Sequence, residues 1–378
     1  MNKRILITGG AGFIGSNLAN QLVSRNCFVR VLDNLSKQIH GENPENSPLY
    51  KSLRPEIEFI HGSVTDSHDL QHSLNGIDTV VHLAAETGTG QSMYEIRRYS
   101  DVNIGGTALL MDIIANSSLS VKKVIVASSR AIYGEGKCCC SVHGIVYPNQ
   151  RILEDMQSGD YELHCPLCNL LVDFLPTDED SFIKPSSVYG ITKLNQEQLV
   201  LTVCKVLGIS AFALRYQNVF GPGQSLTNPY TGILSIFSTR ILNGNGINIF
   251  EDGKESRDFV YIDDVVKATI KSIKYEPHNI TALNIGSGVS TDVLTVAQAL
   301  SERLHKDVPI QISGQFRVGD IRHNVADLTM VKSILGFEPK TSFKEGLNRF
   351  VDWVSREKIS VDRYESSLAE LRSKGLFK

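Results

Sequence analysis

The stretch Ile5-Leu-Ile-Thr-Gly9-Gly-Ala-Gly12-Phe-Ile-Gly15 carries an apolar run directly into three spaced glycines, and an amphipathic segment, 16–24, follows it. The apolar run predicts a β-strand and the later segment a helix. Glycines at these positions let the backbone turn tightly and approach a pyrophosphate, while the helix N-terminus offers free N–H groups. The stretch therefore predicts a dinucleotide-binding strand, loop and helix.

A carboxylate ends the next apolar run, 28–33. Asp33 lies eighteen residues after Gly15, close to the spacing of about 20 at which an acidic side chain meets the adenosine ribose. Because a carboxylate repels a 2′-phosphate, Asp33 favours NAD over NADP. The alternative is that Asp33 only caps a helix or shapes a turn.

Further short apolar runs, 57–61, 79–84, 124–128 and 211–216, alternate with helix-length segments. Strands of this kind are typical of a parallel sheet covered on both faces, so we expect an α/β fold with a doubly wound parallel sheet.

After about Phe220 the chain is richer in Pro, Gly and Asn turns. We expect an NAD-binding Rossmann domain over 1–220 and a smaller substrate-binding lobe over 221–378. The two are expected to interleave, with strand 257–261 and helix 263–275 returning to the main sheet. The residues from about 363 onward are expected to form a surface tail or a final helix.

Composition excludes several classes of function. The 38 basic and 41 acidic residues are scattered and give a net charge of −3, which argues against nucleic acid as a partner. No apolar run reaches the roughly 20 residues of a membrane span. The first residues lack a small-residue cleavage pattern, so we expect no signal peptide. Seven cysteines without an export signal favour the reducing cytoplasm.

Strand ends and the glycine loop supply the other expected cofactor contacts. Small side chains there leave room for a dinucleotide, although Leu83 could simply belong to the core. These contacts are Phe13, Ile14, Asn34, Ser63, Val64, Leu83, Ala84 and Ala85.

Tyr189 and Lys193 lie four residues apart in a segment with helical spacing, so both project from one face. An ammonium near a phenol stabilises the phenolate and lowers its pKa from about 10, which makes a usable general base. This spacing alone is common on solvated helices. Ser128-Ser129, at the end of a buried strand, strengthens the case because a serine hydroxyl there can hold a substrate oxygen.

Taken together, these segments resemble the extended short-chain dehydrogenase/reductase group, specifically its nucleotide-sugar epimerases and dehydratases. The resemblance runs from Lys3 to about Val354. It also rests on Asp101-Val-Asn103, Tyr133-Gly134, the segments 214–222 and 257–264, and Gly319-Asp-Ile-Arg322.

The resemblance implies that Ser129, Tyr189 and Lys193 are catalytic and that the enzyme retains NAD tightly. It implies that Asn103 supports the lysine or its water, and that Gln217 lies near the nicotinamide. It also implies that Asn218, Arg257 and Arg322 hold the substrate diphosphate. The alternative for the two arginines is that each forms only a surface ion pair.

The resemblance also narrows the reaction. Family dehydratases carry an Asp-Glu pair where this chain has Arg130 and Ala131. The glutamate of decarboxylating relatives and the cysteine of 3,5-epimerases are also missing. Inversion at C4 through a transient keto-sugar needs none of these groups.

The segment 84–94 and a cysteine-bearing insert are most similar to the branch that interconverts dTDP-L-rhamnose and dTDP-6-deoxy-L-talose. The alternatives are a UDP-hexose or UDP-uronate epimerase, a keto-sugar reductase, or an idle NAD-binding scaffold. Thr87 is expected at the sugar and Tyr230 at the nucleotide, unless Tyr230 is only a packing residue. The family also implies a homodimer, with helices 104–116 and 190–206 as candidates.

The insert, 136–181, contains Cys140-Ser-Val-His143 and Cys165-Pro-Leu-Cys168. One imidazole and three thiolates in two close pairs match a closed structural zinc site, which would stabilise the insert without taking part in chemistry. Cys138 or Cys139 could replace Cys140, and unliganded thiols or a redox pair at Cys165 and Cys168 are the other interpretations. Cys27 and Cys204 are expected to be small core residues.

Overall fold

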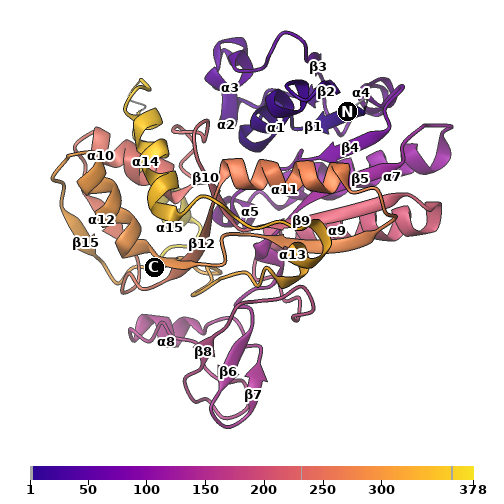
Figure 1. Cartoon of the computed structure of the whole chain (residues 1–378). Helices are drawn as coiled ribbons and strands as arrows, with labels where there is room; N and C mark the ends of the chain where they lie inside the picture. The colour runs from indigo at the N-terminus through magenta and orange to yellow at the C-terminus, as the bar shows by residue number, and fades with distance from the viewer. Residues whose placement is uncertain (1–2, 231, 359–360) are drawn as a thin grey trace.

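The computed structural model describes residues 3–230, 232–358 and 361–378. Its centre is a seven-stranded sheet in the order β13-β9-β5-β4-β1-β2-β3, and every neighbouring pair is parallel (Figure 1). This confirms the expected doubly wound α/β fold. The strands are β1 (Arg4–Thr8), β2 (Phe28–Asp33), β3 (Glu58–His61), β4 (Thr79–His82), β5 (Lys123–Ser129), β9 (Ser210–Tyr216) and β13 (Ile280–Ile285).

Both faces of the sheet are buried because side chains alternate along each strand. In β1, Ile5 and Ile7 enter one core and Leu6 enters the other. The helices α1 (Phe13–Val23), α11 (Ile262–Lys274), α12 (Val293–Arg303), α13 (Thr329–Leu335) and α14 (Phe343–Val354) supply the first core. The helices α4 (Ser67–Leu74), α7 (Gly106–Asn116) and α9 (Val188–Leu207) supply the second.

The second lobe lies beside the carboxyl ends of the central strands. It contains β10 (Asn218–Phe220), β12 (Ser256–Tyr261) and β14 (Ser290–Asp292) in one sheet, β11 (Ile247–Ile249) and β15 (Ile310–Ile312) in another, and helices α10 (Ile233–Leu242) and α15 (Tyr364–Ser373). The expected final helix is therefore present as α15. Short helices α2 (Lys37–His40), α3 (Pro48–Lys51), α5 (Thr89–Ser92) and α6 (Ile96–Tyr99) border the first lobe.

One strand assignment was wrong. The run 257–261, expected in the main sheet, pairs with β10 and β14 instead. The strand that returns to the main sheet is β13, which pairs along its length with β9. Helix α11 does return, since it packs on α1.

The insert forms a separate body at one end of the molecule (Figure 1). Its three strands, β6 (Cys138–Cys140), β7 (Gly144–Val146) and β8 (Asp173–Phe174), make an antiparallel sheet in the order β7-β6-β8. Helix α8 (Leu153–Gln157) lies between them in sequence. Among the described residues, no helix has the length and apolar character needed to cross a bilayer.

A buried ion pair links β5, β9 and α9 below the expected site. Arg215 Nη2 lies 2.6 Å from Glu197 Oε1, and Arg215 Nε donates to both carboxylate oxygens. Ser128 donates to Glu197 Oε2 at 2.5 Å, and Arg215 Nη1 donates to Tyr133 Oη at 2.7 Å. Both charged side chains are about 95% buried or more, so each depends on the other for solvation.

Replacing Arg215 with methionine should destabilise the fold strongly, because it leaves Glu197 buried without its cation. We expect a loss of about 3–5 kcal/mol in the free energy of unfolding, measured by urea denaturation. Arg54→Ala removes a partner from the exposed pair with Glu56 and is the control, with an unchanged midpoint expected. Equal midpoints in the two variants would contradict this role for the buried pair.

Candidate functional site

A cavity of about 550 Å³ lies where the carboxyl ends of β1, β2, β4 and β5 face the second lobe. The glycine loop forms part of its wall through Gly9, Gly12, Phe13 and Ile14. Gly9 has φ +68°, and a Cβ there would come within 2.7 Å of the Ala84 nitrogen, so only glycine fits this turn. Gly15, expected among the cofactor contacts, lies outside the lining. A Cβ at Gly15 would meet the Gly9 carbonyl at 2.4 Å, so it serves helix packing.

Asp33 both stabilises the glycine loop and faces the cavity. Its Oδ2 accepts a hydrogen bond from the Ala11 nitrogen at 2.9 Å, and its Oδ1 accepts one from the Leu35 nitrogen at 2.9 Å. The turn role and the expected ribose-facing position are thus compatible. The other predicted cofactor residues in the lining are Asn34, Ser63, Val64, Leu83, Ala84, Ala85 and Gln217.

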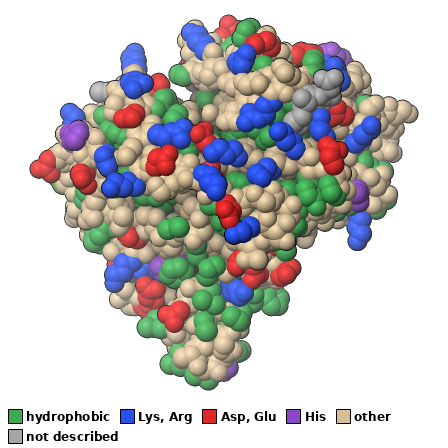
Figure 2. Space-filling model, in the orientation of Figure 1, with side chains coloured by type: hydrophobic (Ala, Val, Ile, Leu, Met, Phe, Trp, Pro, Cys, Tyr) green, Lys and Arg blue, Asp and Glu red, His purple; other side chains and the backbone are tan. Residues whose placement is uncertain are grey.

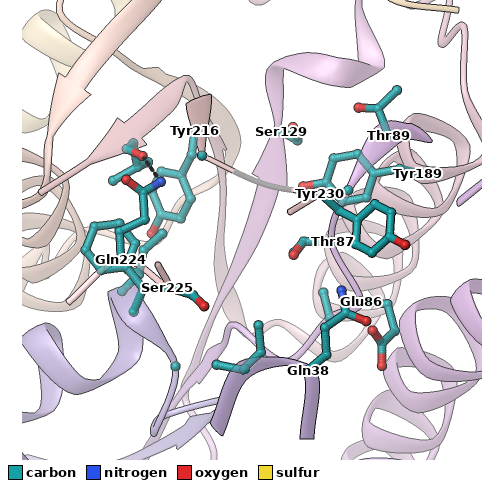
Figure 3. Close-up of a pocket in the computed structure, with 18 of the residues that line it drawn as sticks. Gln38, Glu86, Thr87, Thr89, Ser129, Tyr189, Tyr216, Gln224, Ser225 and Tyr230 are labelled. Atoms are coloured by element: carbon teal, nitrogen blue, oxygen red, sulfur yellow. Dashed lines mark hydrogen bonds between the residues drawn. The ribbon is translucent and has the colours of Figure 1, made fainter. Parts of the chain in front are cut away.

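Ser129, Tyr189 and Lys193 line the same cavity. The side chain of Ser187 caps α9 by accepting from the Gly190 nitrogen at 3.1 Å, which begins the helix just before Tyr189. Figure 3 shows Tyr189, Thr87 and Thr89 on one side of the cavity and Tyr216, Gln224 and Ser225 opposite them. Both Ser128 and Ser129 border the cavity, but the Ser128 hydroxyl donates its proton to Glu197, so it is already engaged within the protein.

The charge beside Tyr189 comes from a residue that the sequence analysis did not assign to it. Burial raises the pKa of Tyr189, while a hydrogen bond with Ser129 and the charge of Arg130 lower that pKa in part. Lys193, the cation expected to lower the pKa of Tyr189, is itself buried, and burial lowers the pKa of Lys193 to about 7. Burial and the neighbouring Arg257 lower the pKa of Arg130 to about 9. Arg130 is therefore the guanidinium that favours the phenolate.

A buried polar chain holds Lys193. Its Nζ donates to Gln196 Oε1 at 2.7 Å, and Gln196 Nε2 donates to Thr107 Oγ1 at 2.8 Å. The His82 ring joins the chain through Thr107 at 2.9 Å, and burial lowers the pKa of His82 to about 3, so the ring is neutral. Gln196, which the sequence analysis did not single out, thus fixes the lysine.

Asn103 was expected to support Lys193, but its side chain makes its hydrogen bonds with other residues. Its Oδ1 accepts from the Glu86 nitrogen at 2.7 Å, and its Nδ2 donates to Thr192 Oγ1 at 2.9 Å. The side chain is fully buried and lies outside the cavity lining. It therefore fixes the backbone at Glu86, which does line the cavity.

Four of the predicted substrate-binding residues line the cavity: Thr87, Asn218, Tyr230 and Arg257. The Tyr230 hydroxyl donates to Glu370 of α15, so this tyrosine also joins two elements.

Arg322 was expected at the diphosphate but is fully buried outside the lining. It pairs with Glu162, Glu251 and Asp252 at 2.6–2.9 Å. Arg317 reaches the cavity instead, with Asp320, Glu255 and Tyr364. No periodicity marks this irregular loop, so sequence spacing could not choose between its two arginines.

The chain resembles known proteins over most of its length. Residues 5–142 and 172–286 match the NAD dependent epimerase/dehydratase family. A dTDP-L-rhamnose 4-epimerase of Burkholderia thailandensis is 38% identical over 94% of this chain and 96% of its own length. A putative UDP-glucose 4-epimerase of Methanocaldococcus jannaschii is 29% identical over 93% of this chain and 98% of its own.

Solved structures agree with this. A UDP-glucose 4-epimerase from Thermotoga maritima with UDP-glucose matches with a TM-score of 0.75 and 31% identity, over 94% of this chain and 99% of that one. A UDP-glucuronic acid 4-epimerase from Bacillus cereus, in complex with UDP-glucuronic acid and NAD, matches with a TM-score of 0.76 and 25% identity, over 93% and 99%.

Replacing Arg130 with glutamine should raise the pKa of Tyr189, because the phenolate loses a cation in a buried site. The acid limb of the pH dependence of kcat should then move upward by roughly one unit. Arg130→Lys retains the charge and should leave the limb close to its original position. An acid limb at the same pH in Arg130→Gln and the unmodified enzyme would contradict the assignment of Arg130.

Proposed function

This chain belongs to the NAD-dependent epimerase/dehydratase family, and on that basis we propose that it inverts C4 of a nucleotide sugar, converting dTDP-L-rhamnose to dTDP-6-deoxy-L-talose. The observation that carries the proposal is the meeting of Ser129, Tyr189 and Lys193 with the glycine loop in one cavity. The identity to the Burkholderia enzyme over nearly the whole length supports the substrate.

The residues present fit NAD. The left-handed turn at Gly9 leaves no room for a side chain beside Ala84, which gives a dinucleotide backbone close access to the loop. Asp33 also lines this cavity, and its carboxylate is suited to accept hydrogen bonds from a ribose diol. When bound, NAD⁺ supplies a reversible acceptor for the hydride on C4.

Tyr189 performs the proton transfer. Its phenolate accepts the proton of the sugar C4 hydroxyl as the C4 hydride leaves, and the sugar becomes a 4-keto sugar. The Ser129 hydroxyl holds the same oxygen. After the keto-sugar turns, hydride returns to its opposite face and Tyr189 gives the proton back to that oxygen. The hydride and the proton that leave the sugar both return to it, so the cycle consumes no external reductant.

The second lobe binds the nucleotide part of the substrate in this proposal. Arg257 and Arg317 both line the cavity, and guanidinium groups bind diphosphate oxygens in pairs. Asn218 lies in the same lining and can donate to them. In this proposal Arg317 takes the place of Arg322 among the residues that bind the diphosphate.

Other reactions fit less well. Arg130 and Ala131 stand where a dehydratase of this family would need carboxylates, so water loss lacks its acid and base. A UDP-glucose or UDP-glucuronate epimerase uses the same core chemistry, and relatives with those names match over more than nine-tenths of this chain. A keto-sugar reductase would have to release its cofactor after each turnover, and an idle scaffold would not need the three reacting residues.

We also propose a homodimer through α7 and α9. These two helices pack together on one face of the sheet. Helix α9 exposes Ile191, Val206 and Leu207, with relative exposures of 46%, 81% and 39%. A second copy is the expected cover for these exposed apolar side chains.

The proposed function is tested by incubating the purified enzyme with dTDP-, UDP-, GDP- and CDP-sugars and following C4 by NMR. We expect inversion of dTDP-L-rhamnose without added NAD, because the cofactor is regenerated in place. Tyr189→Phe should lower kcat by about 10²–10⁴-fold while the protein still binds NAD.

Two outcomes would contradict the proposal. Inversion of UDP-galactose or UDP-glucuronate alone would refute the substrate but leave the chemistry intact. A strict requirement for added cofactor in every turnover would favour the reductase.

A further inference from the structure

We propose that the insert binds one structural zinc ion through Cys140, His143, Cys165 and Cys168. The ligand atoms of these four residues all lie within 4.8 Å of one another. Cys140 Sγ is 3.7 Å from Cys168 Sγ and 3.7 Å from His143 Nδ1, and Cys165 Sγ is 3.6 Å from His143 Nδ1. Zn–S bonds of about 2.3 Å and Zn–N bonds of about 2.0–2.1 Å in a tetrahedron separate ligand atoms by about 3.5–3.8 Å. The observed spacings therefore match a single zinc ion.

The backbone around the four residues presents them toward one point. Cys140 ends β6 and His143 precedes β7, and the Val142 nitrogen donates to Cys140 Sγ at 3.4 Å. The second pair lies on a turn closed by hydrogen bonds from the Asn169 nitrogen to the Cys165 carbonyl and from the Cys165 nitrogen to the Leu170 carbonyl, at 2.9 and 2.8 Å. Each of the two turns therefore supplies two of the four ligands.

A disulfide explains the cluster less well. The sulfurs of Cys140 and Cys168 are 3.7 Å apart, well beyond the S–S bond length of about 2.05 Å. A disulfide would also leave a third thiol and an imidazole converging on the same point without a task. Cys138 and Cys139 are not part of the cluster.

The insert needs a metal because it has little core. Its buried apolar cluster consists of Cys138, Cys140, Val146, Leu163 and Cys165, three of which are cysteines. Many of its apolar side chains lie on the surface instead, and Figure 2 shows them gathered on this projecting end. Val142, Leu167 and Leu171 are each more than 60% exposed. Small bodies of this kind are commonly held by a metal.

The insert is also an addition to the family fold, since the family match stops at residue 142 and resumes at 172. Two of its residues nevertheless contact the loop 317–322, part of which lines the cavity. Arg151 Nη2 donates to the Asp320 carbonyl at 2.9 Å, and Glu162 Oε1 accepts from Arg322 at 2.6 Å. Asp320 and Arg317 line the cavity. We therefore extend the proposal: the zinc ion orders this wall through Arg151 and Glu162.

The metal site is tested on the full-length protein by zinc analysis and by Co²⁺ substitution. We expect about one zinc per chain, and a visible spectrum of tetrahedral thiolate-bound Co²⁺. Cys165→Ser and Cys140→Ser should each lose at least nine-tenths of the zinc. Cys139→Ser is the matched control and should keep it, because Cys139 adjoins a ligand but lies outside the cluster.

Two results would overturn the site. If the unmodified protein supplied with Zn²⁺ or Co²⁺ binds neither, the thiols are unliganded. If Cys165→Ser and Cys140→Ser keep their zinc, the ion lies elsewhere, and the carboxylate groups around Asp66 or Glu251 become the candidates. The Co²⁺ spectrum of the unmodified protein decides the question even if the variants fold poorly.

The link to the cavity is tested by hydrogen exchange before and after chelation of the metal. Amides in 138–171 and in 317–323 should both lose protection, while those of β1 should not change. Loss confined to 138–171 would refute the link, and loss throughout the protein, including β1, would refute a local effect of the metal.

Discussion

The candidate site places a phenol and two cations, Tyr189, Lys193 and Arg130, in one largely desolvated wall of the cavity. Burial lowers the pKa of Lys193 to about 7 and raises the pKa of Tyr189, so desolvation opposes the charged forms of both side chains. The protein offsets this with fixed polar groups, Gln196 behind the lysine and Arg130 beside the phenol. Because these groups belong to α9 and to the turn after β5, the packing of that helix on that strand sets their positions relative to Tyr189.

The sequence predicted the parts of the molecule whose signal is local. Near-continuous apolar runs identified β2 and β9 because both faces of the sheet are covered. The strand β13 gives no such run, since Thr281 and Asn284 interrupt it, and its place in the sheet comes only from pairing with β9. The apolar run of β5 placed Ser128 and Ser129 at the cavity, and only the long-range bond from Ser128 to Glu197 separates the two. In an irregular loop, nothing local shows which way a side chain points.

For the same reason, some roles assigned to residues from the family motifs do not match where the side chains lie. Arg322 sits in the expected motif but pairs with carboxylates, while Arg317 in the same loop meets the cavity. Asn103 likewise supports the backbone at Glu86, and the task expected of it near Lys193 falls to Gln196. In both cases the motif segment borders the cavity, through Val102 and Asp320, while long-range contacts turn the expected side chain away from it.

The insert and the cavity share one network of charged side chains, whose two arginines are buried. Arg151 and Arg322 face Glu135, Glu162, Glu251 and Asp252 at their junction, so carboxylates outnumber guanidiniums there. Burial raises the pKa of Glu135 and takes that of Glu255 to about 7, and Arg257 lowers both pKa values in part. Arg257 also lines the cavity. The charge of Arg257 therefore interacts both with these scaffold carboxylates and with the cavity, so the insert junction and the second-lobe wall are electrostatically linked.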